Sequence, residues 1–153
     1  MAASNIDQFN LVTGQVLAKL YEHFPEPIEL NAEIVGTSIP HWSQNAHGEM
    51  VPSCVHPPEE VFFYHTVHWL AEAGYLSYQN HFYNYQFYRA RLTSKGLEVL
   101  KAIPESLKDG ESFGESLLTA TKDGSKEVLK GMVSEALGIG ARMLSVHFGL
   151  PGS

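Results

Sequence analysis

The chain has 153 residues, 44% of them hydrophobic and 18% charged, which is typical of one globular domain with an appended element and excludes a disordered chain. Its apolar stretches are far shorter than the ~20 residues that a membrane-spanning helix needs. The first residues carry neither basic charge nor an apolar run, and the single cysteine, Cys54, excludes a disulfide within the chain. We therefore expect a soluble, cytoplasmic protein.

Charge is distributed unevenly along the chain, whose net charge is −7. Up to Tyr88 the sequence holds one base, Lys19, against nine acids, whereas from Arg89 onward nine bases nearly balance eight acids. The first half would therefore repel a phosphate backbone at long range. The first basic cluster begins at Arg89 and Arg91.

The N-terminal segment predicts a helix followed by a short strand. From Ile6 to Phe24, apolar residues recur at three- and four-residue steps, and two prolines follow directly. Residues 28–35 then alternate apolar and polar side chains, which predicts a strand with one buried face. Residues 36–56 are rich in Pro, Gly and small polar residues, so we expect mostly loop there. The side chains expected to fix this loop to the body are Trp42, Met50 and Val51.

The middle of the chain predicts a helix, a β-hairpin and a second helix. Two prolines and two glutamates from Pro57 onward form a strong helix start, and Gly74 stands where a helix-terminating glycine belongs. Two aromatic-rich strands are expected at residues 75–78 and 82–92. Thr93 or Ser94 caps the helix that follows, at residues 95–103.

From about Ser112 the apolar pattern predicts a broken or continuous amphipathic helical region, which several glycines interrupt. We expect two units, a winged-helix-like domain at residues 5–105 and a C-terminal amphipathic helical extension at residues 110–148. The extension carries lysines on four-residue steps beside its apolar face, which is typical of a helix that packs on a domain or dimerises.

The predicted fold class is therefore α+β. The expected order is helix, strand, loop, helix, β-hairpin wing and helix, followed by the C-terminal helical region. A helix followed by a two-stranded wing is a winged-helix arrangement. The long loop, or one short turn within it, takes the place of the usual middle helix.

Several motifs resemble those of a family of small, uncharacterised, winged-helix-like bacterial proteins, often encoded by prophages or mobile elements. The motifs are Pro27–Leu30, Glu59–His65, Leu70–Leu76, Arg91–Leu100 and Lys126–Gly131. The resemblance covers roughly residues 9–137 and leaves the segment 36–56 without a counterpart. It implies a winged-helix-like fold and brings no catalytic residues.

Eight histidines and one cysteine raise the question of a metal or nucleophile site. His65 and His68 share a helix face, and the residues that would have to join them are His41, His47, Cys54 and His56. Spacing alone does not bring these groups together, and the sequence holds no Cys-x-x-Cys or His-Glu-x-x-His pattern. The alternative is that one of the pair is half-buried among aromatics and the other exposed. Ser53 and Cys54 lack an adjoining carboxylate, so we expect no catalytic residues, no metal and no cofactor.

The hairpin is rich in aromatic residues, which permits two interpretations. Alternating strand residues put one set into the core, which we expect for Phe82 and Phe87. The other set supplies large contact area at low entropic cost. The candidate interface residues are Tyr78, Tyr83, Tyr85 and Tyr88.

A winged helix usually lays the helix before the wing into the DNA major groove. Residues 57–74 contain no Arg, Lys, Asn or Gln and three glutamates, so this helix lacks the side chains that read base edges. Nucleic-acid contact would fall to the bases around the wing. These candidates are Arg89, Arg91, Lys95 and Lys101, which could equally form a solvated strand and helix face.

We therefore expect a non-enzymatic winged-helix interaction module, regulatory or phage-related, that acts by contact with another protein or by forming a homodimer. The alternative is a DNA-binding transcriptional regulator that contacts DNA through the wing and the following helix.

Overall fold

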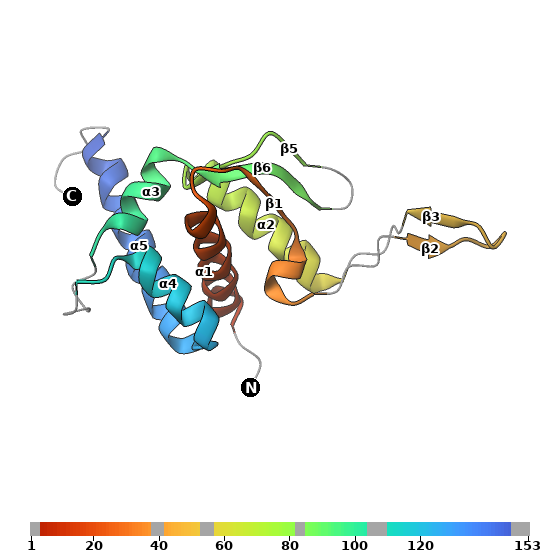
Figure 1. Ribbon diagram of the computed structural model, residues 1–153, viewed down its shortest axis with the longest axis horizontal. Helices are drawn as coiled ribbons and strands as arrows, with labels where there is room; N and C mark the ends of the chain where they lie inside the picture. Colours follow the sequence, from red (N-terminus) through yellow and green to blue (C-terminus); the bar gives the residue numbers. More distant parts are fainter. Residues whose placement is uncertain (1–3, 38–41, 53–56, 82–84, 104–109, 148–153) are drawn as a thin grey trace.

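The computed structural model describes residues 4–37, 42–52, 57–81, 85–103 and 110–147 of an α+β chain. Five α-helices, one 3₁₀-helix and small antiparallel sheets make up these residues (Figure 1). No helix among them is long and apolar enough to cross a membrane.

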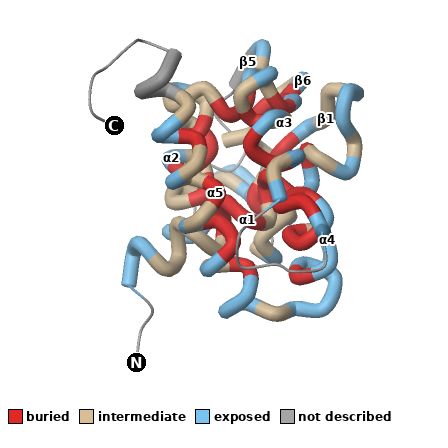
Figure 2. The backbone as a smooth tube through the Cα atoms, turned by 90° about the vertical axis from the view of Figure 1, so that its left-hand side faces the viewer, coloured by how far each residue is buried: buried red, intermediate tan, exposed pale blue. Residues whose placement is uncertain are grey.

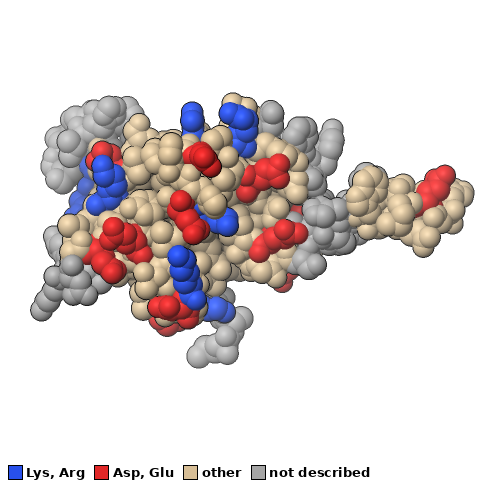
Figure 3. Space-filling view, in the orientation of Figure 1, with Lys and Arg blue, Asp and Glu red and all other residues tan. Residues whose placement is uncertain are grey.

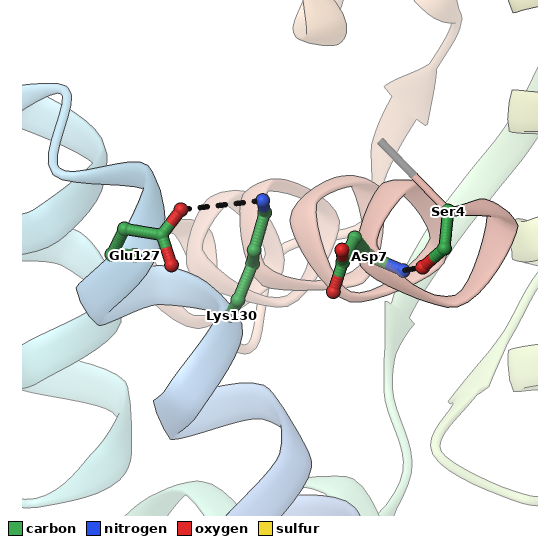
Figure 4. A network of polar contacts seen from close by, with 4 residues as sticks. All are labelled: Ser4, Asp7, Glu127 and Lys130. Atoms are coloured by element: carbon green, nitrogen blue, oxygen red, sulfur yellow. Dashed lines mark hydrogen bonds and ion pairs between the residues drawn. The ribbon is translucent and has the colours of Figure 1, made fainter. Parts of the chain in front are cut away.

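Helix α1 (Asn5–His23) lies at the centre of the helical part and confirms the predicted first helix. The Asp7 N–H donates to the Ser4 side chain at 3.1 Å, which caps the helix (Figure 4). Its apolar face, including Val16, Leu17 and Leu20, is almost fully buried. Burying each of these side chains contributes roughly 1.5–3 kcal/mol.

The predicted strand at residues 28–35 is half wrong. Strand β1 (Ile28–Leu30) ends after three residues, and a 3₁₀-helix (η1, Ala32–Val35) follows. The Asn31 side chain accepts a hydrogen bond from the Glu33 N–H at 2.9 Å, and this local bond favours a turn over a strand.

The expected loop contains a hairpin, made of strands β2 (Trp42–Gln44) and β3 (Met50–Pro52). The side chain of Asn45 accepts hydrogen bonds from two backbone N–H groups of the turn, at 2.9 Å each. The hairpin projects from the body (Figure 1). Trp42 is 58% exposed and Met50 is 62% exposed, so the expectation that they fix this segment to the body is wrong.

Helix α2 (Pro58–Glu72) leads into strands β4 (Leu76–Ser77), β5 (Asn80–His81) and β6 (Phe87–Leu92). The predicted helix and hairpin are confirmed, but Asn80–His81 pairs as strand β5, and the second strand begins at Phe87 and not at residue 82. β6 is the central strand. β1 pairs antiparallel with one edge of β6, and β4 and β5 pair antiparallel with the other edge in one continuous register. Phe87 is fully buried, as predicted, and Phe82 lies outside the described residues.

Helix α3 (Ser94–Lys101) begins next to the end of α2. Hydrogen bonds of Thr93 join the two segments, and we call this contact of Thr93 with Gly74 and Tyr75 the clasp. The Thr93 hydroxyl donates to the Gly74 carbonyl and accepts from the Gly96 N–H at 3.1 Å. The Thr93 N–H donates to the Tyr75 carbonyl at 3.2 Å. Thr93 is thus the N-cap residue and also the tie between the two segments.

Helices α4 (Phe113–Asp123) and α5 (Lys126–His147) form the predicted C-terminal region, broken at Gly124, which has a φ of 72°. A capping box between Ser112 and Glu115 starts α4, and Lys130 pairs with Glu127 at 3.5 Å on α5 (Figure 4).

Both C-terminal helices pack against α1, and their buried residues belong to the same core cluster as those of α1, α2 and the sheet (Figure 2). Gly14 permits the close approach of α1 to α5, because a Cβ there would lie 2.6 Å from the Leu129 Cγ. The division of the chain into residues 5–105 and 110–148 stays a prediction.

We predict that Gly96→Ala strongly destabilises the protein. A Cβ at position 96 would lie 2.0 Å from the Tyr75 carbonyl oxygen, a backbone atom that the clasp holds in place. We expect a loss of about 3 kcal/mol in the free energy of unfolding, measured by denaturant titration.

Gly131→Ala on α5 is the matched control. Nothing lies within 4 Å of its added methyl group, so the better helix propensity of alanine should raise stability by roughly 0.5–1 kcal/mol. Equal stability of the two variants would contradict the close approach at Gly96.

Candidate functional site

An open apolar groove lies between the first turns of α1 and the length of α2. Its volume is about 760 Å³. The residues that line it are Asn5, Ile6 and Phe9 from α1, and Pro58, Val61, Phe62, His65, Thr66 and Trp69 from α2. Polar groups are few among them, so the groove suits an apolar group of a ligand or partner.

Two side chains of the groove are large, apolar and open to solvent. Ile6 is 62% exposed and Trp69 is 47% exposed. The Trp69 ring packs edge-on against Phe9, with centroids 5.3 Å apart. The groove thus presents an apolar surface to solvent.

Periodicity in the sequence does not predict this groove, because it assigns each helix a buried face but does not show where two helices cross. One signal was present. Phe62 and Trp69, seven residues apart, share one face of α2, whereas the buried Phe63 lies on a neighbouring face, so its apolar surface is wider than one core-facing stripe requires.

A second aromatic surface lies where α2 meets the sheet. The Nδ1 atom of His68 lies 3.1 Å from the Tyr78 hydroxyl, and its Nε2 atom lies 3.1 Å from Glu72. The Tyr64 ring stacks with His68 and lies 4.7 Å from the Tyr85 ring. Burial raises the pKa of Tyr78 above its usual value, with smaller contributions from Tyr64 and Glu72.

The structure therefore brings two of the four candidate tyrosines together, Tyr78 and Tyr85, both half-buried beside α2. Tyr88 is also half-buried, and its hydroxyl donates to the Gln86 side chain at 2.6 Å. Tyr83 lies outside the described residues. An interface role for these tyrosines stays a prediction.

The four candidate nucleic-acid contacts differ in their surroundings. Arg89, Arg91 and Lys101 are exposed. Lys95 is half-buried: its ammonium donates to the Ala73 carbonyl at 2.8 Å and lies 4.4 Å from the centre of the Tyr75 ring. Desolvation lowers the pKa of Lys95. Its charge is thus engaged within the fold, whereas the exposed bases are available to a partner.

Arg89 has a φ of 56°, in the left-handed region, and lies where the register between β1 and β6 shifts. Such a bulge changes the direction of a strand and of its side chains. On the face shown in Figure 3, Lys and Arg alternate with Asp and Glu and form no continuous basic patch.

On α2, His65 is exposed and His68 is half-buried, which agrees with the alternative to a metal site given by the sequence. His47 is exposed in the turn of the projecting hairpin. Three further candidates, His41, Cys54 and His56, lie outside the described residues, as does Ser53. Within the part of the chain that the structure describes, no three His, Cys, Asp or Glu side chains form a metal-binding group.

Comparisons with protein-family models, with curated proteins and with solved structures find no match to this chain. The family resemblance inferred from the sequence motifs stays a prediction. The function of the site has to follow from its own geometry.

We predict that Tyr75 and Tyr78 ionise at a higher pH than an unperturbed tyrosine does. Burial raises the pKa of both above the usual 10.0. The stability that depends on their neutral form is present below the unfolded-state pKa near 10.0 and is lost as pH rises through the higher folded-state pKa.

The measurement is an absorbance titration of tyrosinate in the folded protein and in Tyr78→Phe. The variant should lose a late-ionising group from the seven tyrosines of the chain. Loss of a group that ionises at the ordinary pKa would contradict the burial of Tyr78.

Proposed function

We propose that the chain is a non-enzymatic interaction module of winged-helix-like architecture that acts by contact with protein through α2. The order α1, β1, η1, α2, the β4–β5–β6 hairpin and α3 supports this architecture. In it, η1 and the projecting hairpin take the place of the usual middle helix.

The observation that carries the proposal is the character of α2. The helix before a wing reads DNA with Arg, Lys, Asn or Gln, and Pro58–Glu72 contains none of these residues. Instead, it exposes Trp69 beside the apolar groove.

The charge on α2 also favours contact with protein over contact with DNA. Glu59 and Glu72 are exposed, and both would bring negative charge close to the phosphate backbone if the helix approached a major groove. Repulsion between carboxylates and phosphates would oppose that approach at low salt, where electrostatic attraction normally drives binding.

The energetics of the groove favour an apolar partner. Covering the exposed parts of Ile6 and Trp69 removes apolar surface from water, and fully burying such a side chain contributes roughly 1.5–3 kcal/mol. A protein surface supplies matching apolar groups, whereas DNA offers few beyond thymine methyl groups.

A second candidate function is DNA binding through the wing. The exposed side chains of Arg89 and Arg91 on the central strand favour it, because arginines next to a wing can contact phosphates or enter a minor groove.

Titration of a random-sequence duplex of roughly 20 bp at about 50 mM salt separates the two candidates. We expect no saturable binding by the wild-type chain and no change on the double substitution Arg89→Ala and Arg91→Ala. The readout is fluorescence anisotropy of the labelled duplex.

The proposal would be overturned by saturable binding that weakens with salt and depends on these arginines. In that case the slope of log affinity against log salt should shrink by about 2 in the double variant, since each lost phosphate contact removes about one unit.

A further inference from the structure

The β2–β3 hairpin, called the arm below, exposes two large apolar side chains. Its register pairs Gln44 with Met50, and Trp42 lies on the same face as Gln44 because side chains alternate along a strand. Trp42 and Met50 therefore lie on one face together with Gln44, and their exposed fractions are 58% and 62%. A two-stranded hairpin by itself is marginally stable in water, so a partner surface on this face would stabilise it.

The apolar groove is a surface of matching chemistry on the same chain. It begins at Pro58, six residues after the end of the arm at Pro52. The arm carries one acid, Glu49, whose carboxylate accepts a hydrogen bond from Asn45 at 3.0 Å in the turn. The strand residues on the face with Trp42 and Met50 are uncharged, and the residues that line the groove include no Asp, Glu, Lys or Arg, so the two surfaces can meet without a direct charge conflict.

We infer that the chain forms a symmetric dimer in which the β2–β3 arm of each copy places Trp42 and Met50 in the α1–α2 groove of the other. This inference rests on the proposed function and names the partner as a second copy. Reciprocal exchange uses each arm and each groove once, so assembly closes at two copies and does not continue into a filament.

The exposed apolar area suits a weak, reversible dimer. An aromatic side chain can bury 150–250 Å². With Trp42 and Met50 from each arm and Ile6 and Trp69 from each groove, the exchanged surface is on the order of 1,000 Å², below the roughly 1,200–2,000 Å² of stable interfaces and typical of transient ones.

Sedimentation of the full chain over a range of concentrations tests the dimer. We expect a monomer–dimer equilibrium whose dissociation constant rises at least about tenfold in Trp42→Ser and in Met50→Ser. Because the arm projects from the body, both variants should keep the circular dichroism spectrum of the wild type. Val128→Ser, at a half-exposed apolar residue on α5, is the matched control and should leave the equilibrium unchanged.

Tryptophan fluorescence then reports whether Trp42 of the arm becomes buried when the dimer forms. The chain has two tryptophans, so Trp69→Phe leaves Trp42 as the sole emitter while keeping the groove apolar. We expect the Trp42 emission to shift to shorter wavelength as the concentration rises and the dimer forms.

Three results would overturn the inference: a monomer at every concentration, a dimer that persists unchanged in Trp42→Ser, or a short-wavelength Trp42 emission independent of concentration, which would place the arm in its own groove. A monomer that binds no DNA would leave the proposed function standing with a different protein partner. Arginine-dependent DNA binding would reject the proposed function whatever the oligomeric state.

Discussion

The contact between Gly96 and the Tyr75 carbonyl sets how the middle of the molecule is assembled. There the start of α3 lies directly against the chain that leaves α2, with no room for a side chain between them. Thr93 ties the same two segments by hydrogen bonds. Strand β4 leaves this point and β6 returns to it, so the clasp fixes the sheet, the end of α2 and the direction of its exposed face.

Sequence reasoning predicted the elements whose signals are local. Gly74 and Thr93 identified the end of α2 and the start of α3, and alternation identified Phe87 as a core residue. It was wrong where a short-range hydrogen bond outweighed the pattern, as at Asn31. It was also wrong about Trp42, because an apolar residue in a loop gives no sign of whether the body or another molecule covers it.

The candidate site could be predicted only in part for a related reason. The absence of base-reading side chains on α2 is a property of one segment and is visible in the sequence. The groove requires Ile6 and Phe9 to lie beside Trp69, some 60 residues away in the chain, and depends on how two helices cross. Likewise, Lys95 looks like a free base in the sequence, and only its contacts with Ala73 and Tyr75 show that it serves the fold.

Our central claim is that the α1–α2 groove and the arm form the contact surface of a dimer. Hydrogen–deuterium exchange of the backbone amides at about 1 µM and about 100 µM tests it most directly, because dimer formation depends on concentration. We expect added protection at the higher concentration in β2, β3 and the first turns of α1 and α2, with the amides of Arg89–Leu92 unchanged. Identical exchange at both concentrations, or protection confined to strands β4, β5 and β6, would contradict the claim.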